Sequence, residues 1–114
     1  MSKVVLISTS LKNNSNSEYI ARECERCVSD ALSVGYRHID TAQAYFNEAE
    51  VGNAIAKSGI PREELFITTK VWIDHYGYCE TKKSVLESMK KLKTDYIDLV
   101  LLHQPFSDYY GAWS

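Results

Sequence analysis

Four ionisable side chains of different types stand at or just after the ends of short apolar runs in this chain. Asp40 ends one run, Lys70 lies near the end of the next and His103 ends the last, while Tyr45 follows shortly after Asp40. Charged residues on a solvated surface would be scattered along the sequence and would not coincide with the ends of apolar runs. The four side chains are therefore candidate members of one catalytic site.

The types of these four groups suit one kind of chemistry. A tyrosine is a poor acid at neutral pH, but a nearby lysine ammonium favours its phenolate form and makes it a better proton donor. A carboxylate paired with the lysine keeps that ammonium charged and oriented. A histidine hydrogen-bonds a substrate oxygen or relays a proton. Such a set can protonate a carbonyl oxygen that gains negative charge, which predicts hydride reduction of an aldehyde or ketone.

The elements that would position these groups recur about every thirty residues, the size of one βα unit. Helical spacing of apolar residues runs from Ile20 to Leu32 before Gly35, and further helices are predicted over 48–57 and 81–93. Strands alternating with helices predict an α/β fold of four βα-type repeats around a parallel sheet. The predicted strands are 4–9, 36–41, 65–71 and 96–103.

Two architectures fit this order of elements. One is half of a (β/α)8 TIM barrel, since a complete barrel takes about 250 residues and this chain has 114. The other is a small open sheet of the doubly wound, flavodoxin-like type. In both, the carboxyl ends of the parallel strands meet at one edge, which would bring Asp40, Lys70 and His103 together. We expect residues 1–114 to form a single α/β domain.

Composition and charge argue against several kinds of partner. Hydrophobic residues make up 45% of the chain, charged residues 25%, and the formal net charge is -2. These values are typical of a globular protein and give no electrostatic reason to bind nucleic acid or an anionic membrane. No apolar run reaches the ~18 residues that span a bilayer. The first residues lack the apolar core of a secretory signal, so the expected location is the cytoplasm.

Three cysteines are present, and two of them, Cys24 and Cys27, form a C-x-x-C motif. An odd number in a chain of this size argues against a disulfide framework. Both cysteines lie within a helical pattern, and no second pair of ligands is spaced to complete a zinc site. We interpret them as helix residues and expect no metal site.

Residues 24–113 resemble the aldo-keto reductase family, in its bacterial diketogluconate-reductase-like branch. The resemblance implies a (β/α)8 barrel, NADPH as hydride donor and a small carbonyl compound as substrate. By motif, it implies that Asp40 and Lys70 tune the acid, that Tyr45 donates the proton and that His103 orients the carbonyl. The matching stretches are DALSVGYRHIDTAQAYFNEAEVGNAI, SGIPREELFITTKVW and DYIDLVLLHQP.

The same resemblance implies roles for two more residues and shows which part of the family's cofactor site has no counterpart in this sequence. Trp72 resembles the aromatic wall of the substrate pocket, and Thr41 resembles a residue close to the nicotinamide. In the family, later strands supply most of the NADPH contacts, and no counterpart follows LLHQP in this sequence. We therefore expect a half-barrel piece of such an enzyme with weak or no activity. The open edges of a half barrel would pair with another copy, which predicts a homodimer.

Residues 3–21, KVVLISTSLKNNSNSEYIA, resemble a different family, the flavodoxin-like NAD(P)H-dependent FMN reductases. In that family a strand runs into a Ser/Asn-rich loop whose backbone N–H groups and hydroxyls hold the flavin phosphate. The alternative is a polar loop with Ser15 or Ser17 as a helix N-cap. The residues that would form the phosphate cradle are Ser8, Ser10, Ser15, Asn16 and Ser17.

Together the two resemblances predict a chain of two origins. Residues 1–23 would be a flavodoxin-like βα opening, and residues 24–114 an aldo-keto reductase region. An engineered chimera, a rearranged gene and a truncation all fit this pattern. Besides carbonyl reduction, the alternatives for function are therefore an FMN- or phosphate-binding module and an inactive scaffold.

Overall fold

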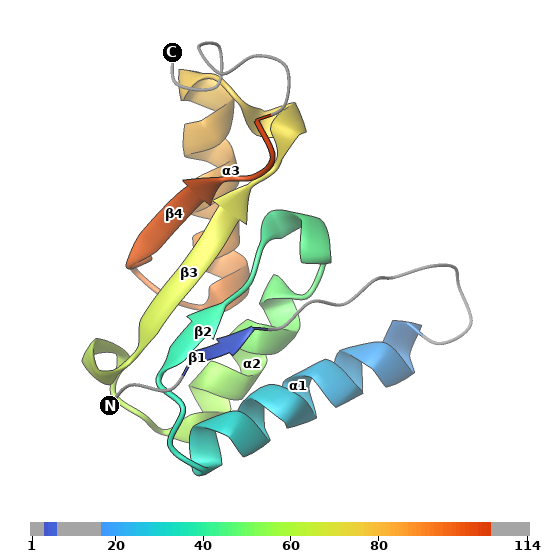
Figure 1. The fold of residues 1–114 in the computed structure, drawn as a ribbon, viewed down its shortest axis with the longest axis vertical. Coiled ribbons are helices and arrows are strands. Elements are labelled where there is room, and N and C mark those ends of the chain that lie inside the picture. Colours follow the sequence, from blue (N-terminus) through green and yellow to red (C-terminus); the bar gives the residue numbers. More distant parts are fainter. Residues whose placement is uncertain (1–3, 7–16, 106–114) are drawn as a thin grey trace.

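The computed structural model describes residues 4–6 and 17–105. Within these ranges the chain forms one parallel sheet, and its α-helices follow the strands in alternation (Figure 1). The strands are β1 (Val4–Leu6), β2 (His38–Asp40), β3 (Phe66–Val71) and β4 (Leu99–Leu102). The α-helices are α1 (Ser17–Ser33), α2 (Glu48–Ser58) and α3 (Tyr78–Leu92).

The strands lie in the sheet in the same order as in the sequence, β1-β2-β3-β4, and every neighbouring pair is parallel. A flavodoxin-like sheet would place its first strand between the second and third, because its order reverses at that point. The doubly wound alternative is therefore wrong. Sequential parallel order is that of a (β/α)8 barrel, so the prediction of a half-barrel arrangement is confirmed.

A single hydrophobic core lies between the sheet and the helices. Val28 of α1, Val51 of α2 and Leu92 of α3 all belong to it, together with Ile39 and Ile67 of the sheet, and each of these five is fully buried. Helices on both faces of a sheet would produce two such cores. One core with members from every helix means that the three helices cover the same face of the sheet.

Helix boundaries follow local backbone chemistry. Gly59 ends α2 in a left-handed conformation (φ 69°), which glycine adopts without steric cost. The helix predicted over 81–93 begins earlier, at Tyr78, because the backbone N–H of Thr81 already donates to the carbonyl of Gly77 at 2.9 Å. The structure therefore extends this helix toward its N-terminus.

The last strand is shorter than the predicted range 96–103. Before Leu99, the Asp98 carboxylate accepts hydrogen bonds from the backbone N–H of Ile67 at 2.8 Å and from Arg62 at 2.7 Å. A side chain thus takes part of the role of the backbone in holding this segment against β3. Regular strand pairing begins at Leu99 as a result.

The C-x-x-C cysteines lie in α1, as predicted. Cys24 is buried and Cys27 is exposed, and both are free thiols. Burial, reinforced by the nearby Glu50 carboxylate, raises the pKa of the Cys24 thiol to about 11. Since the thiolate is the reactive form, Cys24 is a packing residue at neutral pH. Among the residues described here, no helix is long and apolar enough to cross a membrane.

We predict that Gly52→Ala disrupts the contact between α2 and α3. A Cβ at this position would lie 2.1 Å from the carbonyl oxygen of Lys91 and 2.8 Å from Cα of Leu92, so backbone would have to move. Alanine is the better helix former by ~1 kcal/mol, but overpacking typically costs ~1–3 kcal/mol or more. The free energy of unfolding in urea should therefore fall. Ala56→Ser, on the exposed side of the same helix, is the control, and an unchanged or higher stability for Gly52→Ala would contradict the close packing.

Candidate active site

The centre of the site is an ion pair that joins two neighbouring strands. Asp40 ends β2, and Lys70 stands one residue before the end of β3. The Lys70 ammonium donates to Oδ1 of Asp40 and, at 3.0 Å, to the carbonyl oxygen of Thr41. The side chains are 14% and 21% exposed for Lys70 and Asp40 respectively, so water screens the pair only in part.

Tyr45 reaches this ion pair from the loop after β2. It lies in a single 3-10 turn, Gln43–Tyr45, that packs against β3. The Lys70 ammonium is 5.2 Å from the centre of the Tyr45 ring. The ring of His103, just beyond β4, meets the Tyr45 ring edge to face with 5.9 Å between centroids. The structure therefore brings together all four residues of the predicted catalytic set.

His103 is partly buried and lies close to the Lys70 ammonium. Its backbone N–H donates to Val71 at 3.0 Å, which extends the β3–β4 pairing. Burial lowers the pKa of its imidazole below the usual 6.5, the Lys70 ammonium lowers it further, and Asp40 opposes both. Within the described part of the chain, its buried Nδ1 has no hydrogen-bond partner. An unpaired buried nitrogen beside the other three groups is typical of a site that binds a ligand or a water molecule.

Trp72, the residue that resembles the family's aromatic wall, borders the same cluster. Its ring lies 5.4 Å from the ring of His103, nearly perpendicular to it. Its backbone N–H donates to Oε1 of Gln43 at 2.9 Å, so the turn that carries Tyr45 is tied to the residue after β3. This bond links the positions of the proposed acid and of the pocket wall.

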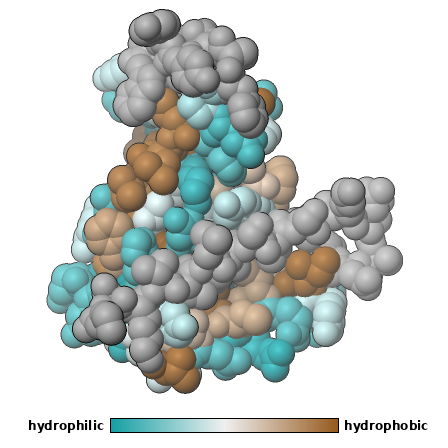
Figure 2. Space-filling model, in the orientation of Figure 1, coloured by the Kyte–Doolittle hydropathy of each residue, from teal (hydrophilic) through white to brown (hydrophobic). Residues whose placement is uncertain are grey.

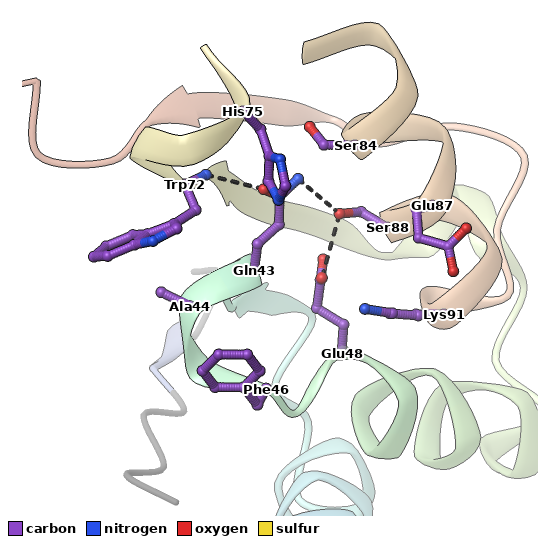
Figure 3. Close-up of a pocket in the computed structure, with 10 residues that line it drawn as sticks. All are labelled: Gln43, Ala44, Phe46, Glu48, Trp72, His75, Ser84, Glu87, Ser88 and Lys91. Atoms are coloured by element: carbon purple, nitrogen blue, oxygen red, sulfur yellow. Dashed lines mark hydrogen bonds between the residues drawn. The ribbon is translucent and has the colours of Figure 1, made fainter. Parts of the chain in front are cut away.

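A chain of buried hydrogen bonds continues from Gln43 into the body of the protein (Figure 3). Nε2 of Gln43 donates to the Ser88 hydroxyl at 3.1 Å, and Ser88 in turn donates to Oε1 of Glu48 at 3.2 Å. The other oxygen of Glu48 accepts from the Thr69 hydroxyl at 2.9 Å. The loop with Tyr45, the start of α2, helix α3 and strand β3 are thereby held in one network.

Glu48 is the buried carboxyl group of this network, with 3% of its surface exposed. Burial raises the pKa of its carboxyl group above the usual 4.5, and the hydrogen bonds from Thr69 and Ser88 oppose the shift. It also stands in the first turn of α2, where the helix dipole favours a negative charge. Sequence reasoning missed Gln43, Ser88 and Glu48, although a glutamate opening a helix was visible in NEAEVG.

A small cavity of about 150 Å³ lies beside this network, between the Gln43–Tyr45 turn and α3 (Figure 3). Trp72 is the only predicted site residue in its lining, so the cavity adjoins the catalytic set and is separate from it. Its lining residues are Gln43, Ala44, Phe46, Glu48, Trp72, His75, Ser84, Glu87, Ser88 and Lys91.

The remaining predicted site residues fall into two groups. Thr41 is fully buried, and its hydroxyl donates to Oδ1 of Asn47 at 2.6 Å, so this hydroxyl holds the loop that leads to α2. Ser8, Ser10, Ser15 and Asn16 lie outside the described residues. Ser17 begins α1, but its side chain also lies outside the described part.

Comparison with known proteins places this chain in one family. The profile of the aldo/keto reductase family matches residues 8–112, which is most of the chain. The chain belongs to the aldo/keto reductase family.

Individual relatives agree with this assignment. Methylglyoxal reductase DkgB of Salmonella typhi is 58% identical over 78 residues, which cover 68% of this chain and 29% of that protein. The crystal structure of an aldo/keto reductase from Brucella melitensis is 44% identical with a TM-score of 0.79, covering 96% of this chain and 41% of that one. A Bombyx mori aldo-keto reductase in complex with NADP is 40% identical with a TM-score of 0.78, covering 90% and 34%. The chain thus spans less than half the length of each of these relatives.

The comparisons bear on the predicted flavodoxin-like opening. The family match begins at residue 8, inside the segment 3–21 that resembles FMN reductases. The Brucella structure covers 96% of this chain, which leaves little room for a foreign opening. Neither comparison supports a chimera or an FMN site.

We predict that Glu48 makes the stability of the fold pH-dependent. Because its folded-state pKa is raised, the folded protein binds the proton more tightly than the unfolded chain, and stability is lost as pH rises from 4.5 through the folded pKa. Glu48→Gln removes this titration. The melting temperature of the wild type, relative to Glu48→Gln, should fall as the pH rises from 4.5 through the raised pKa of Glu48. Glu80→Gln, an exposed carboxylate on α3, is the control, and an equal pH dependence for both variants would contradict the assignment.

A second prediction concerns His103. Its imidazole should titrate below 6.5 in an NMR pH series, with the signal assigned by its loss in His103→Gln. Lys70→Met should raise this pKa, because it removes the ammonium that repels the imidazolium and leaves the attracting Asp40 carboxylate. A titration midpoint at or above 6.5 in the wild type would contradict the lowered pKa of His103. No response to Lys70→Met would show that the two side chains do not interact.

Proposed function

We propose that this chain carries the proton-donating site of an NADPH-dependent reduction of a small aldehyde or ketone, with Tyr45 as the proton donor. The observation that supports this most directly is the position of Lys70, which binds Asp40 and stands 5.2 Å from the centre of the Tyr45 ring. A phenol needs a neighbouring cation to act as an acid near neutral pH. Lys70 is that cation.

Each remaining group has a role that follows from its contacts. Asp40 holds the Lys70 ammonium toward Tyr45 and preserves its charge on a half-buried face. When Tyr45 gives its proton to the carbonyl oxygen, the ammonium stabilises the phenolate that remains. His103, kept neutral by burial and by Lys70, donates a hydrogen bond from a ring N–H to the same oxygen and orients it. Trp72 supplies an apolar wall beside His103.

The four side chains of the proposed site need a hydride from a bound cofactor. Carboxylate, phenol, ammonium and imidazole move protons and stabilise charge, but none of them supplies a hydride. NADPH supplies that hydride when it is bound. The Bombyx mori relative was solved in complex with NADP, which supports the same cofactor here. Thr41 is the proposed neighbour of the nicotinamide, and since its hydroxyl is bonded to Asn47, its other atoms would make the contact.

A small dicarbonyl compound is the proposed substrate class, on the basis of the relative named methylglyoxal reductase. We propose slow turnover for the 114-residue chain. A single copy leaves the ion pair open to water on one side, and water weakens the electrostatic stabilisation that a closed site would provide. An FMN-dependent function is not proposed, because no contact of the described residues favours it.

The test is reduction of methylglyoxal by the purified chain, followed as NADPH oxidation together with product formation. Tyr45→Phe should lower kcat by at least ~100-fold, the usual size of a general-acid contribution. Tyr36→Phe is the matched control, because Tyr36 lies before β2 and away from the ion pair. Turnover that survives Tyr45→Phe, or that Tyr36→Phe removes equally, would contradict the assignment of the acid.

A further inference from the structure

The face of the sheet that the helices leave open can be defined by its contacts. The His38 ring meets Phe66 at 4.6 Å between centroids, and its Nε2 lies 3.1 Å from the Thr68 hydroxyl. Lys70 binds Asp40 on the same face, since alternate residues of a strand point the same way. Thr69 points to the opposite face, where it bonds Glu48 of α2. We call the open surface the inner face.

Strand β4 adds apolar side chains to the inner face. Leu99 pairs with Thr68 and Leu101 pairs with Lys70, so both leucines share that face with their partners. Each leucine is 40% exposed, and Phe66 is 42% exposed. Figure 2 shows the corresponding hydrophobic surface over β4. Parallel sheets are normally covered on both faces. Among the described residues, nothing covers this apolar strip.

The outer edge of β4 is also unpaired in the described part of the chain, because β4 has β3 as its single neighbour. His103 donates its backbone N–H to Val71 of β3. Since the direction of the N–H alternates along a parallel strand, Leu101 also points its N–H toward β3. Val100 therefore points its N–H away from the sheet. At the other edge of the sheet, β1 has β2 as its single described neighbour.

We propose that a second copy of this chain covers the inner face, with β4 of each copy pairing in parallel with β1 of the other. Two sheets of four strands in sequential order then form a closed barrel of eight, the strand number at which side chains alone fill the interior. A twofold axis makes the two seams identical and leaves no free edge. This inference does not depend on the proposed activity.

The size of the surface favours closure over an open chain of copies. One seam of three or four residues is short compared with a stable interface, which buries about 1,600 Å² in total. Both seams and the inner faces must therefore form together, and this happens only in a closed pair. An open filament would keep Phe66, Leu99 and Leu101 exposed on every copy.

The charges of the inner face permit this burial. Lys70 and Asp40 are its described charged residues, and they neutralise each other in one ion pair. Closing the barrel therefore does not require an unpaired charge to leave water, which would cost several kcal/mol per ion. The apolar end of the face, at Phe66 and Leu99, contributes the favourable burial.

The test is the mass of the full 114-residue chain in solution, by sedimentation equilibrium and native mass spectrometry from about 1 to about 200 µM. The expected species has twice the 13.0 kDa mass of the chain. Leu99→Glu places a charge on the inner face and should weaken dimerisation by at least ~10-fold. Val100→Pro removes the outward N–H and blocks the seam without touching the bonds to β3. Circular dichroism shows whether each variant folds. If one of the two variants does not fold, the other still tests the interface.

Leu86→Glu is the matched control, because Leu86 is 50% exposed on α3, on the covered side of the sheet. It should leave the dimer intact. A monomer at all concentrations would overturn the proposal, as would a series of larger oligomers in place of a dimer. A dimer that persists in folded Leu99→Glu or Val100→Pro, or that Leu86→Glu weakens equally, would place the interface elsewhere.

Discussion

The ion pair between Lys70 and Asp40 joins β2 to β3 at the end of the sheet where the polar groups gather. Its geometry depends on the register of the two strands, in which Asp40 lies opposite Thr68 and Lys70 extends just beyond. The same ammonium binds the Thr41 carbonyl, so it also fixes the start of the loop that carries Tyr45. A charge left alone on this half-buried face would be costly, which makes each partner necessary to the other.

The two faces of the sheet have different physical roles. The face under the helices is closed and mainly apolar, with Ile39 and Ile67 fully buried in a single core. The inner face changes along the strands from apolar at Phe66 to charged at Lys70. Stability therefore comes mainly from one side of the sheet, while the proposed chemistry lies at one end of the other. This separation is typical of barrel enzymes, in which loops at the carboxyl ends of strands carry the chemistry.

A buried polar network connects these two roles. Glu48 sits between the sheet and α3, accepting hydrogen bonds from Thr69 and Ser88, and Ser88 passes the connection to Gln43. Gln43 then holds the backbone of Trp72. Such a network is favourable only when its members are satisfied, and here each contributes a partner to the next. The turn that carries Tyr45 is positioned by helix packing as well as by β2.

The sequence by itself determined the repeating βα units, the helices and the clustering of four ionisable residues. Each depends on local signals: apolar periodicity, glycine at helix ends, and single ionisable residues at strand ends. Asp40, Tyr45, Lys70 and His103 were predictable because parallel strands bring their carboxyl ends together whatever their order. The strand order itself was not predictable, since a barrel and a doubly wound sheet share the same local pattern. Only the packing of all three helices on one face decided it. That packing also created the Glu48 network, whose bonds join residues 21 to 45 positions apart.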